Sequence, residues 1–250
     1  MSGTDNKRRQ PRIPALGSHH HRAYVGPYDE YDIKGALQFS LLTFLGLREH
    51  HRLLDIGCGS LRLGRLMLVY LAAGNYCGLE RNDWLVDDAV ANELTPCFFE
   101  KKHPEIVYDS SWDLSHFAAG PFDYVNIHSI FCHAPSREIR RCLSAIRRRI
   151  HDHTTVSATF AEGTTSYAGS DWVYPDVVRY ERKSIKEMCR EEGYAVTPLS
   201  WAHPKQQWFL LSHPAGAQRI SRVAEVVAAM SETCPYWSSE SCFSPCQPSN

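Results

Sequence analysis

Apolar residues along this chain form two kinds of pattern that alternate with each other. Short continuous apolar runs, bounded by Gly, Pro, Asn or Asp, are typical of buried strands. Between them, apolar residues return every three or four positions, which is typical of amphipathic helices. The runs predict strands over residues 52–56, 75–80, 105–108, 122–127, 154–160, 194–199 and 207–211. The stripes predict helices over residues 32–45, 61–72, 83–93, 136–150, 181–192 and 217–230.

The order of these elements predicts an α/β fold. Strands that alternate with helices favour a doubly wound, mainly parallel sheet with helices on both faces. The connection between the last two predicted strands is too short for a crossover helix, so these strands should be antiparallel neighbours. We therefore expect seven strands, one of them antiparallel. The first predicted helix should pack beside a ligand cleft with the apolar stripe Ala36, Leu37, Leu41 and Phe44.

Composition changes at both ends divide the chain. Residues 1–23 are polar and basic and predict a flexible tail, in which the run 19–21 of three histidines is an exposed tract. Residues 24–215 form the predicted domain, and residues 216–231 a C-terminal helix that either caps the domain or forms a homodimer contact. Residues 232–250 are rich in Ser, Pro and Cys and predict a second flexible tail. Its cysteines lack a close C-x-x-C pair, so we expect free thiols and no metal site.

Composition narrows the class of protein without choosing its chemistry. A chain of 250 residues can bury a large core as one domain. The formal net charge of -1 argues against a nucleic-acid partner, and no apolar run or leader pattern indicates a membrane or secretory segment. The nine cysteines are odd in number and spread through predicted strands and helices, which favours a reducing, cytoplasmic location.

The most specific motif is a strand, turn and helix that begins at Leu53-Leu54-Asp55-Ile56-Gly57-Cys58-Gly59-Ser60. The two glycines let the backbone turn sharply and approach a ligand. Glu80 ends the next predicted strand, where a carboxylate can accept hydrogen bonds from ribose hydroxyls. Asp55 would repel the pyrophosphate of a dinucleotide, but it suits a ligand with a cationic amino group. The third glycine of the dinucleotide pattern is absent, because Arg62 takes its place.

Asp55-x-Gly57-x-Gly59 together with Glu80 resembles motifs I and II of the class I S-adenosylmethionine (SAM)-dependent methyltransferases. The resemblance extends from about residue 28 to about residue 211. Residues 122–129 resemble the family's fourth strand and its exit, and residues 130–133 resemble the segment that leads into the next helix. The family's usual Pro-Gly-Gly turn is replaced here by His151-Asp152-His153. The resemblance implies a Rossmann-like fold and SAM as the cofactor.

The resemblance also implies cofactor contacts at the carboxyl ends of the central strands. These are Asp55, Gly57, Cys58, Gly59, Ser60, Glu80, Arg81, Asn82, Asp109, Asp113, Asn126 and His128. The glycine turn would hold the methionine part and the ribose, and Glu80 the ribose hydroxyls. Either Asp109 or Asp113 would meet the adenine amino group. A plain strand-to-helix turn, the structural alternative, needs the glycines but not Asp55.

Two histidines and an aromatic loop are the candidates for work on the acceptor. His128 and His133 follow the fourth predicted strand and could serve as a base for an acceptor that must lose a proton, or could simply make structural hydrogen bonds. The loop 162–180 contains Trp172 and Tyr174, which either cover a substrate or make ordinary packing contacts. The connection 201–208 is expected to be a hairpin turn with buried tryptophans.

The sequence thus predicts a SAM-dependent methyltransferase that acts on a small molecule through oxygen or nitrogen. The fourth strand ends in Asn126-Ile127-His128-Ser129. This sequence does not resemble the Asn/Asp-Pro-Pro-Tyr/Phe pattern of enzymes that methylate amino groups of nucleic-acid bases. Two alternatives belong to other classes. A noncatalytic SAM-binding or interaction protein would keep the Asp55 to Glu80 constellation without a productive acceptor pocket. An NAD(P)-dependent oxidoreductase would have to tolerate Asp55 near the pyrophosphate.

Overall fold

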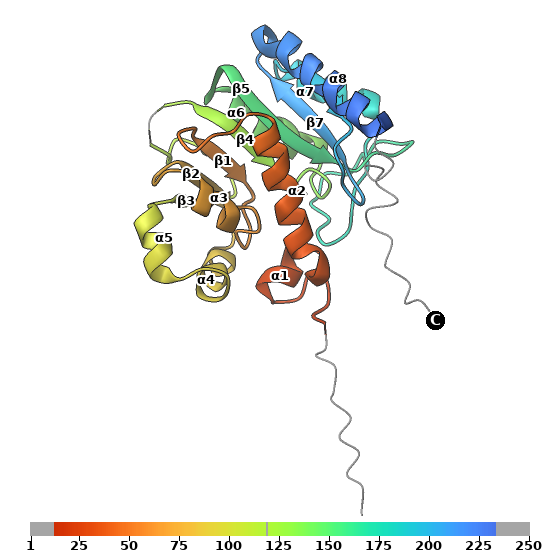
Figure 1. The fold of residues 1–250 in the computed structure, drawn as a ribbon. Coiled ribbons are helices and arrows are strands. Elements are labelled where there is room, and N and C mark those ends of the chain that lie inside the picture. The colour runs from red at the N-terminus through yellow and green to blue at the C-terminus, as the bar shows by residue number, and fades with distance from the viewer. Residues whose placement is uncertain (1–12, 119, 234–250) are drawn as a thin grey trace, which may run out of the picture.

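The computed structural model describes residues 13–118 and 120–233. A sheet in the order β3-β2-β1-β4-β5-β7-β6 runs through the centre of the molecule (Figure 1). The strands are β1 (Leu53–Ile56), β2 (Tyr76–Glu80), β3 (Glu105–Tyr108), β4 (Phe122–Ile127), β5 (Ile150–Phe160), β6 (Ala195–Leu199) and β7 (Gln207–Ser212). Within the described residues, β7 is antiparallel to both of its neighbours and the other pairs are parallel. The predicted fold class is therefore confirmed.

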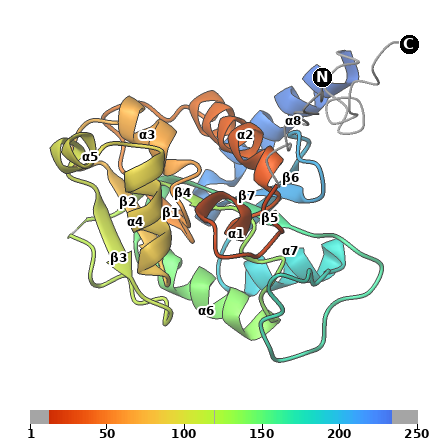
Figure 2. The ribbon, with the colours of Figure 1, turned by 90° about the horizontal axis from the view of Figure 1, so that it is seen from below.

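Helices cover both faces of this sheet (Figure 2). They are α1 (His21–Tyr24), α2 (Tyr31–Phe44), α3 (Gly64–Tyr70), α4 (Asp83–Asn92), α5 (Pro96–Lys102), α6 (Ser136–Arg147), α7 (Arg182–Glu191) and α8 (Ala217–Thr233), with short 3-10 turns at Tyr28–Glu30 and Pro214–Gly216. Apolar residues of α6 and α7 pack on one face, while α2, α3 and α8 pack on the other. The pattern did not predict α5, which begins at Pro96 behind the capping hydroxyl of Thr95.

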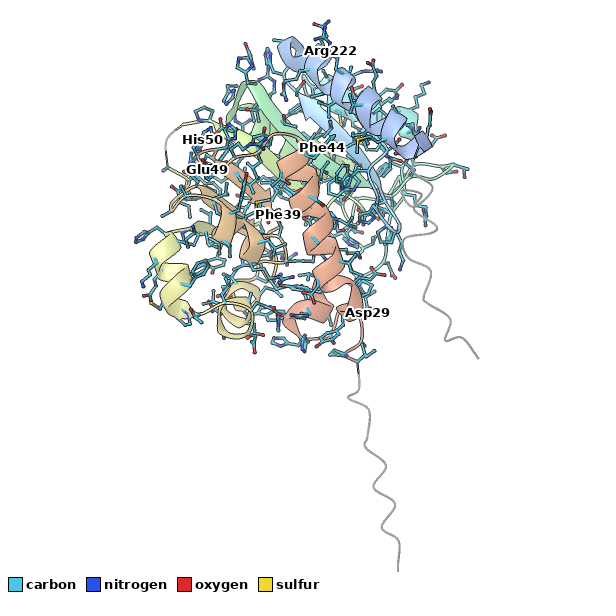
Figure 3. The ribbon with its side chains drawn as sticks, viewed as in Figure 1. Asp29, Phe39, Phe44, Glu49, His50 and Arg222 are labelled. Carbon is cyan, nitrogen blue, oxygen red and sulfur yellow. The ribbon has the colours of Figure 1, made fainter. Side chains whose placement is uncertain are left out.

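The buried face of α2 differs from the predicted apolar stripe. Ala36 and Phe44 are exposed, whereas Lys34 and Gln38 are buried along with Leu41 and Leu42. Figure 3 shows the side chains of Phe39 and Phe44 along this helix, and Phe44 packs against the ring of Trp201 at 5.3 Å between centroids. The prediction of the buried face from apolar residues alone was wrong, because α2 turns polar side chains towards the interior beside β1 and β4.

The N-terminal segment 13–24 packs against the body of the protein. His19 stacks on Trp84 of α4 at 4.0 Å between ring centroids. His21 Nε2 lies 2.8 Å from Glu93 Oε1, and Arg22 Nη2 donates to Glu93 Oε2 at 2.7 Å. The sequence predicts a flexible tail over residues 1–23 with an exposed histidine tract; in the structure His19 is exposed and His21 is buried, and hydrogen bonds from His21 and Arg22 connect this part of the chain to Glu93 at the end of α4. Residues 1–12 lie outside the described residues.

The C-terminal helix α8 lies on the β6 side of the sheet. Its stripe residues Ile220 and Val227 are buried in a cluster with Leu199, Trp208 and Leu210. Of the two alternatives from the sequence, this stripe therefore caps its own domain. Residues 234–250, which include the three C-terminal cysteines, lie outside the described residues.

Candidate functional site

A cavity of about 620 Å³ opens at the carboxyl ends of the central strands. Its lining comes from the exits of β1, β2, β3 and β4, from the N-terminal segment, from the loop 172–179 and from the β6–β7 connection. Such a volume is typical of sites for drug-sized ligands. Strand order brings these exits together, because parallel strands end at the same edge of the sheet.

The turn after β1 requires its glycines. Gly57 and Gly59 have φ angles of 66° and 54°, in the left-handed region that glycine adopts without strain. A Cβ atom at Gly57 would lie 2.2 Å from Ile130 Cδ1, and one at Gly59 would lie 2.7 Å from Val25 Cγ1. Leu61 also has a positive φ of 54°, so the turn continues and α3 begins at Gly64, three residues later than predicted. The result is bare backbone facing the cavity.

Glu80 ties this turn to the next strand. Its carboxylate accepts hydrogen bonds from the backbone N–H groups of Gly59 (2.9 Å), Arg81 (2.9 Å) and Asn82 (3.0 Å). Burial raises the pKa of Glu80, and these hydrogen bonds oppose the rise. Glu80, Arg81 and Asn82 all line the cavity, as predicted. Glu80 therefore organises both loops even before any ligand contact.

Asp55 lies beneath the turn with only 3% of its surface exposed. One carboxylate oxygen accepts from the Tyr76 hydroxyl and the other from Asn126 Nδ2, each at 2.9 Å. Burial outweighs these two bonds and raises the pKa of Asp55 to about 6. Asp55 and Cys58 line a small hollow of about 20 Å³ under the main cavity. Gly57, Gly59 and His128 line both the hollow and the main cavity. A buried carboxylate that forms no ion pair among the described residues thus sits next to the bare glycine turn, and the charge of Arg62, which lines the same hollow, acts on it from a greater distance.

Five predicted cofactor contacts do not line the main cavity: Asp55 and Cys58 line only the hollow beneath it, and the other three line neither. Ser60 is fully buried within the turn. Asn126 is also fully buried, and its amide donates to Asp55 and Gln38, so it orients the carboxylate instead of facing the cavity. Asp113 lies out in the loop after β3, where it accepts from the Ser115 N–H at 2.8 Å. Of the two alternatives in that loop, the structure brings Asp109 to the cavity.

The two candidate histidines differ in what their ring nitrogens face. His128 is buried, with Nδ1 at 2.9 Å from Arg62 Nη2 and Nε2 at 3.1 Å from His203 Nε2. His133 has Nδ1 at 2.6 Å from the carbonyl oxygen of Asp176, an acceptor, so Nδ1 carries the proton and Nε2 the lone pair. Both rings line the cavity, and burial lowers the pKa of each. Both imidazoles are therefore neutral near pH 7.

The aromatic loop reaches the cavity and also makes packing contacts, so contact with a substrate stays a prediction. Trp172 and Tyr174 line it and are 41% and 37% exposed. Tyr174 packs against the rings of His133 and of Tyr24, whose centroids lie 5.0 Å and 5.2 Å away. Leu16 and Tyr24 of the N-terminal segment and the residues 25–27 that follow it line the same wall. The sequence did not predict this role, because nothing in a short irregular segment indicates where it docks.

A polar group on the opposite wall was also missed. It consists of Lys34 on α2, Arg62 after the glycine turn, and His203, Lys205 and Gln206 in the β6–β7 connection. The connection does bury Trp201 and Trp208, as expected, but it also reaches the cavity. The available signal was the pair Lys34 and Gln38, one helical turn apart on a face that packs inward.

Metal sites and membrane-spanning helices are two further features to consider. In residues 13–118 and 120–233, no cluster of three or more His, Cys, Asp or Glu side chains could hold a metal ion. Over the same part of the chain, none of the helices combines the length and the hydropathy that a bilayer crossing requires.

Comparisons with known proteins agree on the fold. No family model and no curated protein matches the chain. Magnesium protoporphyrin IX methyltransferase of Synechocystis PCC 6803, solved with bound S-adenosylhomocysteine (SAH), has a TM-score of 0.54 and 14% identity over 74% of this chain and 86% of its own. Glycopeptide N-methyltransferase MtfA, solved with SAM, has a TM-score of 0.55 and 11% identity over 72% and 94%. A SAM-dependent methyltransferase of Clostridium acetobutylicum gives 0.53 and 9% over 74% and 96%. The chain has the class I SAM-dependent methyltransferase fold.

Proposed function

We propose that this protein is a SAM-dependent methyltransferase that acts on a small-molecule acceptor through oxygen or nitrogen. The observation that carries the proposal is the bare glycine turn above the buried, unpaired carboxylate of Asp55. The ammonium group of SAM supplies the positive charge that this carboxylate lacks. The fold of the solved methyltransferases supports the same assignment.

The residues present fit SAM on the β2 and β3 side of the cavity. Gly57 and Gly59 would hold the methionine part against backbone, Glu80 the ribose, and Asp109 the adenine amino group. Bound there, SAM supplies an electrophilic methyl group, which bonds to the acceptor atom as the carbon–sulfur bond breaks and its electron pair stays on sulfur, leaving SAH. The protein's main contribution is then to hold the acceptor close and in line.

We further propose that His133, rather than His128, takes the acceptor's proton where one must be lost. Both ring nitrogens of His128 already face other side chains, Arg62 and His203. His133 uses Nδ1 on the carbonyl of Asp176, which leaves the Nε2 lone pair available in the cavity wall. A neutral imidazole with a free lone pair can accept a proton from an alcohol, phenol or ammonium group.

Titration calorimetry with SAM and SAH tests the assignment. We expect micromolar binding to the wild type and its loss in Asp55→Ala, while Asp113→Ala, an exposed acid off the cavity wall, binds like the wild type. Binding of NAD(P) without SAM would instead establish the oxidoreductase alternative. Tight SAM binding with no SAH released across broad acceptor panels would favour the noncatalytic alternative.

Replacement of the histidines tests the base. With an acceptor in hand, His133→Gln should lower kcat by about 10²–10⁴-fold at unchanged SAM affinity. The exposed His116 provides a matched control, because His116→Gln alters a ring outside the cavity. An unchanged kcat in His133→Gln would remove His133 from the reaction.

A further inference from the structure

Buried cations gather on one wall of the cavity. Lys34 and Arg62 are only 6% and 7% exposed, and Lys205 and Arg179 line the same cavity. Lys34 Nζ pairs with Glu30 Oε2 at 2.6 Å. In the described part of the chain, Arg62, Arg179 and Lys205 form no ion pair. Arg179 and Lys205 are exposed, so Arg62 is the buried cation of this wall that forms no ion pair among the described residues, although the charges of Asp55 and Glu30 act on it from beyond ion-pair distance.

The cations lie on the opposite side of β1 from the acids that fit the nucleoside. Glu80 and Asp109 follow β2 and β3, on one side of β1 in the sheet order. Arg62 contacts His128, which follows β4 on the other side, and His128 contacts His203 in the β6–β7 connection. Arg62 thus belongs to the part of the cavity left for the acceptor.

On this wall two N–H groups of histidine rings face each other, so one of them has no acceptor. Backbone N–H groups of Lys205 (3.1 Å) and Gln206 (2.8 Å) both donate to His203 Nδ1, so the proton of neutral His203 is on Nε2. The Arg62 guanidinium can only donate, so His128 Nδ1 at 2.9 Å must accept, and the proton of neutral His128 is also on Nε2. The two Nε2 atoms lie 3.1 Å apart, and both would carry a proton.

A protonated ring would not resolve this conflict, because it adds a further donor. Burial and the charge of Arg62 keep the pKa of His128 well below its usual range, and burial lowers the pKa of His203 to about 3. Besides the histidine pair, this wall has a second unsatisfied donor, Arg62 Nε, which is buried with no hydrogen-bond partner. Arg62 Nε therefore lacks an acceptor within its reach, although a buried acceptor of the same wall, Gln206 Oε1, is also without a hydrogen-bond partner.

We propose that the methyl acceptor is an organic anion, a carboxylate or a phosphate ester, whose anionic group binds the cluster of Lys34, Arg62, His128 and His203. This inference rests on the proposed methyltransferase function. An anion that accepts from Arg62 Nη2 and Nε releases His128 Nδ1 to hold the ring proton. His128 Nε2 then accepts from His203 Nε2–H, and the anion, which has lone pairs to spare, also accepts from His128 Nδ1–H, so that each of these donors has a partner.

The carboxylate of SAM is the other source of such an anion. It is a single negative charge, and SAM also brings an ammonium and a sulfonium group, so SAM leaves the cavity more positive than before. Arg62 is the buried cation without an ion pair, and the exposed Arg179 and Lys205 line the cavity beside it. An anionic acceptor offsets the positive charge that SAM adds next to Arg62, whereas a neutral acceptor does not.

The test titrates wild-type protein saturated with SAH, so that the carboxylate of the cofactor is already in place. The probes are benzoate and phenyl phosphate, with benzyl alcohol as the neutral counterpart, in isothermal calorimetry. We expect both anions to bind at least tenfold more tightly than the alcohol. Failure of both anions to bind, or equal binding of the alcohol, would overturn the proposal without the use of any variant.

Variants locate the anion. Arg62→Gln and Lys34→Met should each weaken anion binding at least tenfold, with Arg62→Lys partly restoring it. Arg65→Gln is the control, because Arg65 pairs with Asp32 outside the cavity. Thermal melts report whether each variant is folded, and His203→Gln gives a second route if Arg62→Gln does not fold.

The remaining outcomes separate the two sources and the two proposals. Suppose that anions bind only SAH-free protein, and that Arg62→Gln weakens SAM but not decarboxylated SAM. The cluster then serves the cofactor, and the acceptor assignment is wrong. Absence of SAH binding to folded wild type would sink the proposed function, and the acceptor assignment with it, while titration of the free protein still reads whether an anion site exists.

Discussion

At the scale of single residues, the environment of Asp55 decides what it can bind and at which pH. The carboxylate is buried and receives two hydrogen bonds from neutral groups, but the bonds do not repay its lost hydration. Its pKa is therefore raised from 3.8 to about 6. A cationic ligand stabilises the charged form, so ligand binding and deprotonation of Asp55 favour each other.

We predict that the affinity for SAM follows the ionisation of Asp55. Below the raised pKa the free protein carries a neutral Asp55, and binding must first remove its proton. Between pH 7 and 8 the dissociation constant should be constant, and below about pH 6 it should rise towards tenfold per pH unit. Calorimetry across this range measures it. Asp55→Asn should bind weakly with no such slope, and an acid slope that persists in this variant would contradict the assignment to Asp55.

The sequence was sufficient to predict site residues that lie close together in the chain. It was insufficient to predict those that reach the cavity only when distant elements pack together. Gly57 and Gly59 follow β1 and Glu80 ends β2, the next strand along the chain, so their spacing already indicated that they meet at the same edge of the sheet. Lys34 and His203 come from a helix and a connection about 170 residues apart. Neither stands in a motif, and only the packing of α2 and of the β6–β7 connection against the strand exits brings them together.

At the scale of elements, period and length predicted six strands to within one residue at either end and the short or irregular elements poorly. The exception among the strands is β5, which begins at Ile150, so that His151-Asp152-His153 lies in the strand and not in the expected turn. Strands such as β3 and β4 agree with the prediction residue for residue, because continuous apolar runs between turn residues have few other uses. α5 has only seven residues, too few to show a period. α1 is shorter still and is held by side-chain contacts with α4.

We predict that Glu93 controls the order of the N-terminal segment. Glu93 is the shared partner of His21 and Arg22, and their hydrogen bonds outweigh burial to lower its pKa. Glu93→Ala should destabilise segment 13–24 by about 1–3 kcal/mol while leaving the sheet intact. Hydrogen exchange should show faster exchange of the amides of Gly17 and Tyr24. Glu100→Ala, an exposed acid on α5, is the control, and equal effects of both variants would contradict this role.

The two valines in the middle of α8 separate its two faces. Val227 is fully buried against the sheet, whereas its neighbour Val226 is 54% exposed. Val227→Asp should lower the free energy of unfolding by about 3 kcal/mol or more, because it buries an unpaired charge. Val226→Asp should change it by less than about 0.5 kcal/mol. Denaturant unfolding measures both.

A homodimer through α8 stays a prediction, and dissociation of a dimer by Val226→Asp in size-exclusion chromatography would support it.

At the scale of the whole molecule, the cavity is assembled from segments that span nearly the entire described chain. The glycine turn forms its floor, the N-terminal segment and the loop 172–179 meet above it through Tyr24 and Tyr174, and the β6–β7 connection closes another side. A ligand that touches the floor and the walls together should therefore stabilise distant parts of the chain at once.

We predict that SAH slows hydrogen exchange both at the turn 57–62 and in the N-terminal segment. At a SAH concentration of 100 times its dissociation constant, binding contributes about 2.7 kcal/mol, so amides that exchange only from the free protein should slow by about 100-fold. In α6 and α7, which take no part in the cavity, amides that exchange through local opening should exchange as before, because only opening that releases SAH is slowed. The Asp55→Ala variant should show no protection at all. Protection confined to residues 57–62 would mean that the N-terminal segment does not close over the cofactor, and its walls would then belong to the acceptor alone.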